Sequence, residues 1–240
     1  MRFIDLQEAL EVEINKLDDN LTKPTTLISE YFLNTALDKF WKTRYSENNF
    51  KRESFEQTQK RIDDLRTLVT QYLYTDEVVK VSNELYTVQL PSDYLILLGD
   101  TAGIAPADGM TLPCWKKDSN GKYVIKNTDT IEATIDTIDR IKENSLSEYH
   151  LHYAKARPIR LIQGDSIKLS TDGKYKVAQY LLTYLRKPVK IDLHTNPFAQ
   201  YTDMPDHTHI EIVKLAAQMY IENQADPRYN TYTNETVSME

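Results

Sequence analysis

Cysteine is nearly absent from this 240-residue chain, whose only thiol is that of Cys114. One thiol excludes an internal disulfide and a metal centre built from several thiolates. This scarcity is typical of proteins that assemble in a reducing cytosol. Because a lone cysteine between Pro113 and Trp115 is typical of a small packed residue, we expect Cys114 to be buried and inert.

Long apolar runs and phosphate-binding motifs are missing as well. No stretch approaches the roughly 20 apolar residues that cross a bilayer, and the first residues lack the regions of a signal peptide. Neither G-x-G-x-x-G nor G-x-x-x-x-G-K-[ST] occurs, although these glycine-rich patterns are the common phosphate cradles. We therefore expect a soluble, unexported protein that enters no membrane and uses no cofactor.

Basic residues are outnumbered, with 29 Lys and Arg against 36 Asp and Glu and a formal net charge of −7. A nucleic-acid groove needs clustered cations, whereas the cations here are interleaved with acids. An acidic balance suits a wall past which DNA slides without binding. The basic and aromatic segment from Phe40 to Tyr45 resembles a stacking surface for nucleic acid, but we interpret it as the buried end of a helix.

Tyrosine is the residue in excess, with 16 Tyr against 6 Phe. Its side chain joins a large apolar face to a polar tip, so an excess suits partly hydrated surfaces such as subunit contacts. Drift in an AT-rich genome predicts the same excess. The sequence leaves both explanations open.

Apolar residues at helical spacing predict three helices in a helical region of residues 1–74. The first covers residues 5–18, the second begins near residue 26, and the third covers residues 54–72. Short links between them favour antiparallel packing.

Residues 75–200 have the composition of a β-rich region, with a loop and helix excursion at residues 99–145. Four of the six glycines fall within residues 99–122, which predicts a loop. Inside it, Asn120 and Gly121 predict a hairpin turn. Isoleucines spaced by four and three residues predict a helix over residues 128–144.

Two strands are expected near the end of the β-rich region, over residues 158–169 and 175–186. The second is expected to be half of a hairpin, because Asp172 and Gly173 suit the positive φ angles of a tight turn.

The last segments are a helix and a tail. Residues 201–225 predict a helix that begins at Pro205 and Asp206 and packs on the N-terminal helices. Residues 226–240 lack apolar periodicity, so we expect an extended C-terminal arm. The expected fold is α+β, with a β-rich region inserted between helices that pack together.

Histidine offers the best case for chemistry, because four of the five histidines form two H-x-H pairs. On a strand, His150 and His152 would share one face and could bind a metal with Glu148 as third ligand. His207 and His209 lie at a helix start, where their side chains diverge. We interpret both pairs as surface or subunit-contact histidines and expect no metal site.

Paired acids do not improve the case for an enzyme. Asp63 and Asp64 lie among lysine and arginine residues, which is typical of a solvated, salt-bridged helix face. No other arrangement of residues is catalytic in type. We therefore expect that the protein is not an enzyme.

Four segments in order resemble the head–tail adaptor, or ring, proteins of short-tailed bacteriophages, especially the crAss-like group. The segments are FWKTRYSENNFKRESFEQTQKRIDDLRTLV, LPSDYL, LLTYLRKPVKID and MPDHTHIEIVKLAAQMYIENQADPRYNTYTNE. The same order is similar to the tail tubular adaptors of podophages. Residues 99–145 match least.

The resemblance implies a structural virion protein, assembled in the host cytoplasm, that forms a homo-oligomeric ring of twelve copies at the head–tail junction. Such a ring contacts the portal protein and the next tail component, and DNA passes through it without specific binding. Two alternatives remain: a metal-dependent enzyme that uses His150 and His152, and an acidic intracellular binding module.

Two sets of residues follow as candidate sites. The arm would bind a partner through four side chains, namely Arg228, Tyr229, Tyr232 and Asn234. The channel would be lined by carboxylates, because cations would hold the DNA. The preferred lining residues are Asp129, Glu132 and Asp136, ahead of Glu11 and Glu13.

Overall fold

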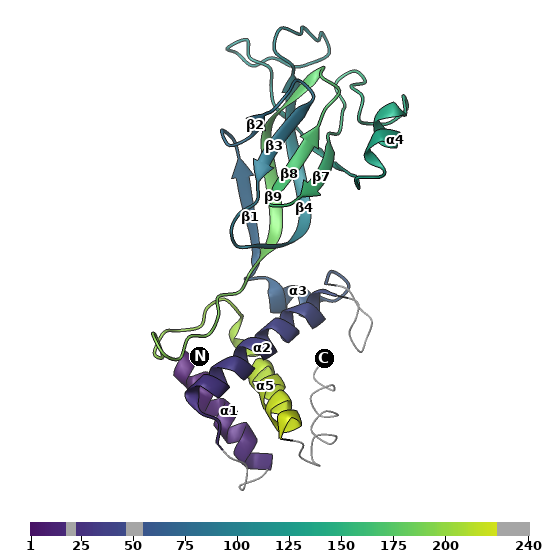
Figure 1. Ribbon diagram of the computed structural model, residues 1–240. Coiled ribbons are helices and arrows are strands. Elements are labelled where there is room, and N and C mark those ends of the chain that lie inside the picture. The colour runs from purple at the N-terminus through teal and green to yellow at the C-terminus, as the bar shows by residue number, and fades with distance from the viewer. Residues whose placement is uncertain (18–22, 47–54, 225–240) are drawn as a thin grey trace. The chain divides into compact units, whose positions relative to one another are not determined.

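The computed structural model describes residues 1–17, 23–46 and 55–224, which form an α+β fold of two units (Figure 1). The helical unit comprises Met1–Leu68 and the chain from Pro188 onward, and the β unit comprises Val69–Lys187. The chain therefore passes between the units twice, which makes the β unit an insertion within the helical one.

The helical unit contains α1 (Phe3–Leu17), α2 (Thr26–Tyr45), α3 (Gln59–Leu65), a short 3₁₀ turn (Asp206–Thr208) and α5 (His209–Asn223). Helix α5 packs on both α1 and α2, as expected for the C-terminal helix. The core is built by apolar residues at helical spacing from all three helices: Leu6, Leu10, Ile14, Leu33, Leu37, Phe40, Val213, Ala217 and Ile221. No helix in the described ranges is long and apolar enough to cross a membrane.

The predicted third helix is wrong at its C-terminal end. Helix α3 stops at Leu65, and Val69–Tyr74 is strand β1, paired along its length with Tyr180–Leu185. The segment VTQYLY is β-branched and aromatic, and pairing in a sheet overrides its weak helical periodicity. Ser54, the expected start of the helix, lies outside the described residues.

The β unit consists of two sheets that share one core. One sheet has the order β1-β9-β4-β5, with β9 (Tyr175–Arg186), β4 (Tyr94–Pro106) and β5 (Lys126–Asp129). The other has the order β2-β3-β8-β7-β6, formed by β2 (Val79–Lys80), β3 (Leu85–Gln89), β8 (Ser166–Ser170), β7 (Ile159–Gln163) and β6 (Ile131–Glu132). Buried residues of both sheets belong to one apolar cluster, as in a β-sandwich.

Several expected elements of this unit differ from the structure. Residues 99–106 are not a loop but the second half of β4, the longest strand described. Residues 158–169 are two strands, because Gly164 adopts a positive φ of 60° and reverses the chain into a hairpin.

The two predicted turns have different outcomes. Strands β8 and β9 lie in different sheets, so the turn at Asp172 and Gly173 crosses between sheets and is not a hairpin turn. The expected turn at Asn120 and Gly121 is confirmed by the Lys117–Tyr123 bridge.

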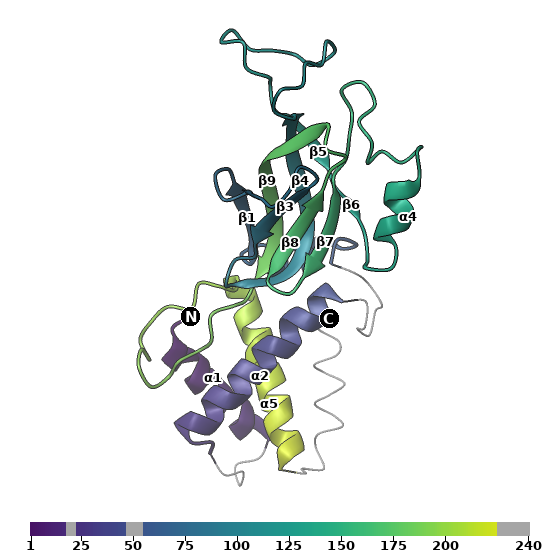
Figure 2. The ribbon, with the colours of Figure 1, turned by 45° about the horizontal axis from the view of Figure 1, so that its top comes forward.

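Residues 128–144 are not one helix. They form the end of β5, the short β6 and the six-residue helix α4 (Ile138–Glu143), which lies beside β7 (Figures 1 and 2). Ile131 pairs with Ile159 in a parallel ladder, so the first of the four isoleucines belongs to a sheet. Ile138 and Ile141 pack on a small cluster with Ala133, Tyr149 and Ile159. Periodicity alone could not separate these outcomes, since isoleucine favours strands as well.

Candidate functional site

The first histidine pair lies in an irregular segment of residues 148–157 and not on a strand. The Nε2 atom of His150 lies 3.1 Å from the carbonyl oxygen of Lys142 at the end of α4. His152 and Lys155 close a tight turn through two backbone hydrogen bonds of 3.0 Å. At its tip, Tyr153 has a φ of 57° and a side chain that is 88% exposed. The left-handed backbone conformation is uncommon for tyrosine, and such residues cluster at functional sites.

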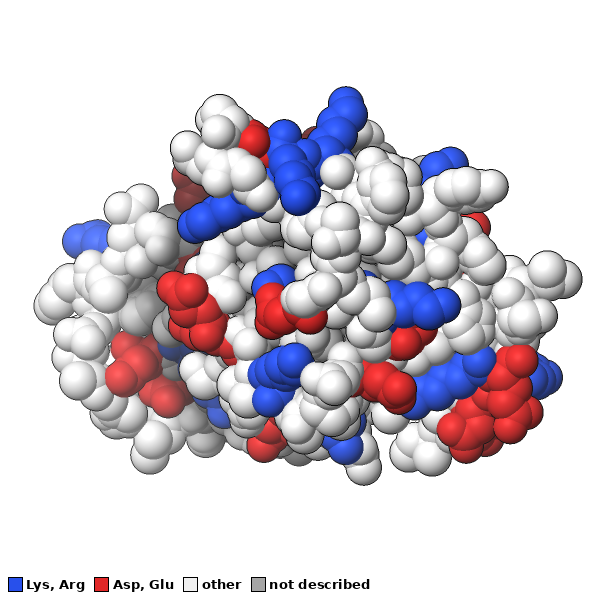
Figure 3. Space-filling view, turned by 90° about the horizontal axis from the view of Figure 1, so that it is seen from above, with Lys and Arg blue, Asp and Glu red and all other residues white. Residues whose placement is uncertain are grey.

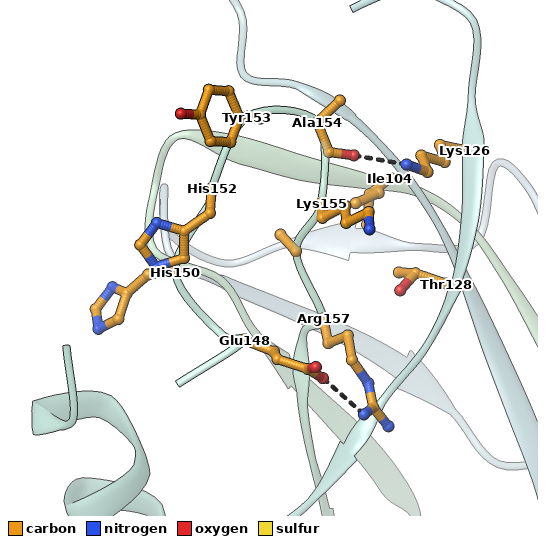
Figure 4. A pocket seen from close by; sticks show the side chains of 11 residues that line it. Ile104, Lys126, Thr128, Glu148, His150, His152, Tyr153, Ala154, Lys155 and Arg157 are labelled. Carbon is orange, nitrogen blue, oxygen red and sulfur yellow. Dashed lines mark hydrogen bonds and ion pairs between the residues drawn. The ribbon is translucent and has the colours of Figure 1, made fainter. Parts of the chain in front are cut away.

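A cavity of about 440 Å³ lies between this turn segment and the edge of the sheet (Figure 4). Lys126 and Thr128 of β5 form one wall, together with Ile104 of β4. The other wall is formed by residues from the 148–157 segment, including both histidines, Tyr153, Lys155 and Arg157. We call this cavity the β5 groove.

Side chains hold the two walls of the β5 groove together. Lys126 donates through Nζ to the carbonyl oxygen of Ala154 at 2.8 Å. Arg157 donates from the opposite wall to the carbonyl oxygens of Asp129, at 3.2 Å, and Thr130, at 2.9 Å. The same arginine pairs with Glu148 at 2.8 Å. Beyond these residues the walls converge, where β6 and β7 pair directly.

The β5 groove is cationic although the chain is acidic. It brings together Lys126, Lys155 and Arg157 against a single carboxylate, that of Glu148. On the face that Figure 3 shows, basic and acidic side chains are both scattered among uncharged ones. A second hollow adjoins the groove through shared residues Lys126 and Ala154 and adds Lys116 with the exposed apolar side chains of Val124 and Ile125.

The described residues contain no group of three or more His, Cys, Asp and Glu side chains that could hold a metal. Glu148, the third ligand considered for the first pair, forms its ion pair with Arg157. In the second pair, the Nε2 atom of His207 lies 2.9 Å from a carboxylate oxygen of Asp64. His209 is fully buried, with Nε2 3.1 Å from the carbonyl oxygen of Met204, and burial lowers its pKa.

Three expectations about individual residues are wrong. His209, expected at the surface or in a subunit contact, is fully buried. Cys114 is exposed and lines the second hollow, because its neighbour Trp115 fills the buried position and donates to the carbonyl oxygen of Val124. Asp64 is not on a solvated face but fully buried, and it pairs with the equally enclosed Arg44. The helix end from Phe40 to Tyr45 is buried as expected at Phe40, Trp41 and Arg44, whereas Lys42 is exposed.

The three preferred channel-lining residues, Asp129, Glu132 and Asp136, are exposed, whereas Glu11 and Glu13 of α1 are half-buried. Asp129 is the last residue of β5, Glu132 is the last residue of β6, and Asp136 lies in the turn that precedes α4. Glu132 reaches to within 3.4 Å of Arg160. The preferred arm residues, from Arg228 to Asn234, lie outside the described residues.

Strand β1 is a second unusual surface that the sequence reading missed. Within the described ranges it forms one edge of its sheet and pairs only with β9, and it contains no charged residue or proline. Tyr72 is 39% exposed and Leu73 is 54% exposed. The other described sheet edges are only two residues long or, in β5, carry Lys126 and Asp129. The signal for this strand is the β-branched and aromatic run VTQYLY, whose first four residues fall within the helix predicted over residues 54–72.

No family model and no curated protein sequence matches the chain. The surfaces themselves therefore carry the functional inference. They are the uncharged edge of β1 and the cationic β5 groove, at opposite edges of one sheet.

Proposed function

We propose that this chain is a subunit of a homo-oligomeric ring at the head–tail junction of a short-tailed bacteriophage. The ring would connect the portal to the tail and extend the DNA channel. Support comes from the ordered sequence resemblance to such adaptors and from the architecture, in which a β unit is inserted into a unit of terminal helices.

The observation that carries self-association is the edge of β1. An exposed strand edge offers unpaired backbone groups to another chain, and monomeric proteins protect such edges with charge, proline or short length. Six uncharged residues with exposed Tyr72 and Leu73 have none of these protections. We assign this edge to the contact with the neighbouring copy.

A ring also needs two different contact surfaces on each copy, because only head-to-tail contacts generate a cyclic assembly of many subunits. The sheet β1-β9-β4-β5 provides two unlike edges, one uncharged and one cationic. Both belong to the β unit, so their separation is fixed by one sheet.

Mass measurement tests the proposal. The full chain, alone and mixed with the portal protein of the same phage, is expected to form a closed oligomer in native mass spectrometry and a ring with a central channel in electron micrographs. A lysine pair on the edge, Gln71→Lys with Leu73→Lys, should abolish this assembly without unfolding the chain. Ser119→Lys adds charge to an exposed loop of the same unit and should leave assembly intact.

A chain that stays monomeric at its solubility limit, both alone and with the portal, would contradict the proposal. So would assembly that tolerates the two edge lysines as well as it tolerates the control.

A further inference from the structure

The β5 groove has the chemistry of a site for a carboxylate on an apolar stem. Ile104 and Ala156 are buried at its base, and the stems of Lys126 and Lys155 flank it. The Nζ atom of Lys126 is held by Ala154, whereas no bond of the Lys155 ammonium is seen in the described part of the chain. An anion that enters the groove would meet Lys155 first, with apolar surface beside it.

The walls favour an extended peptide as the ligand. Strand β5 pairs with β4 on one side only. On its other side, Arg157 occupies the carbonyl oxygens of Asp129 and Thr130, and no strand lies beside the rest of β5 in the described residues. An added strand gains main-chain hydrogen bonds there, while pockets for alternate side chains provide specificity.

Residues 225–240 of this chain have the matching pattern. They carry Asp226, Glu235 and Glu240 against Arg228 alone. In an extended peptide, alternate residues share a side, so Glu235 would lie on the same side as Val237 and Met239. That side offers one carboxylate followed by two apolar groups, which complements Lys155 and the apolar base of the groove.

We propose that residues 225–240 of one copy bind in the β5 groove of another copy, with Glu235 paired to Lys155. The choice of a second copy rests on the proposed ring. A nucleic-acid strand fits the groove less well, because Glu148 stands at the rim and the base is apolar, whereas phosphates need repeated cations.

Charge exchange tests the pairing in the full chain. Lys155→Glu and Glu235→Lys should each weaken self-association by at least about tenfold, and combining them should restore it. Lys174→Glu changes an exposed lysine of the same unit outside the groove and should have no effect. Sedimentation or native mass spectrometry measures association, and circular dichroism confirms folding.

Direct binding separates this proposal from the proposed ring. A fluorescent peptide of residues 225–240 is titrated with the full chain and with its Lys155→Glu variant. The peptide should bind the unaltered chain at least about tenfold more tightly. A peptide with Glu235→Lys should show the reverse preference.

Each outcome decides one proposal. Rings that form while the peptide binds both proteins equally would overturn the groove assignment and leave the ring. Peptide binding with the expected charge exchange, in a chain that never assembles, would support the groove and contradict the ring. Tighter binding of a single-stranded oligonucleotide than of the peptide would also overturn the assignment.

Discussion

Buried tyrosines are the distinctive residues of the β unit. Their rings fill the apolar core, while their hydroxyl groups reach polar partners: Tyr74 bonds the carbonyl of Gln89, Tyr175 that of Tyr149, Tyr180 the carboxylate of Asp100 and Tyr184 that of Asp93. Asp100 is itself enclosed and also contacts Thr130 and Arg160, each at 2.6 Å. Much of the tyrosine excess therefore serves the core and not subunit contacts.

These tyrosines predict a loss of stability at alkaline pH. Burial raises the pKa of Tyr149 to about 12, and burial with a bond to Asp93 raises that of Tyr184 to about 12. The pKa of each tyrosine is higher in the folded state than in the unfolded state. Their contribution to the free energy of unfolding is therefore complete below about pH 10 and is lost as the pH rises through about 12. The free energy of unfolding in urea should fall across this window.

The Tyr149→Phe variant should show a shallower decline between about pH 10 and 12 than the unaltered chain, whatever its stability at neutral pH. Tyr31→Phe, at an exposed position on α2, serves as the control. Equal slopes for the unaltered chain and Tyr149→Phe would show that this hydroxyl does not link folding to pH.

A buried ionic network joins the elements of the helical unit. Arg44 at the end of α2 lies 2.9 Å from Asp64 of α3 and 2.5 Å from Glu211 of α5. The Nε group of Arg44 is not aligned as a hydrogen bond to Asp64, so this contact is an ion pair. His207 approaches the other oxygen of Asp64, and Arg61 of α3 donates to the carbonyl of Thr43.

We expect Asp64→Ala to destabilise the chain by about 3–5 kcal/mol, because it leaves the Arg44 guanidinium buried beside one carboxylate fewer. Its neighbour Asp63, half-buried on the same helix, provides a matched control. Asp63→Ala should change the free energy of unfolding by less than about 0.5 kcal/mol. Urea denaturation measures both, and similar losses for the two variants would contradict the network's role.

At the scale of the whole molecule, the proposed channel concerns the β unit alone. The proposed carboxylates Asp129, Glu132 and Asp136 all lie in the β unit and are exposed there. Glu132 contacts Arg160, so its reversal would place two cations together. Asp129 and Asp136 are therefore the better pair for testing a channel, because reversing their charge does not also disrupt the contact between Glu132 and Arg160.

We expect Asp129→Lys with Asp136→Lys to leave ring formation intact and to impair DNA packaging or ejection, because cations in a channel hold phosphates. Particle DNA content and ejection kinetics measure the effect. Two exposed acids of the other unit, reversed as Glu8→Lys and Glu222→Lys, provide a charge-matched control. Normal particles from the Asp129 and Asp136 variant would exclude these residues from the channel wall.

The sequence alone determined the α+β class, helices α1, α2 and α5, and the turn at Gly121, because these depend on local periodicity and turn chemistry. Tertiary structure decided the secondary structure of residues 69–74 and 128–144. Their β-branched and aromatic side chains are compatible with a strand or a helix, and pairing with a partner strand selects the strand. It also decided which of two adjacent aspartates is buried, since that depends on where Arg44 lies. The β5 groove joins residues from 104 to 157, and only folding brings them together.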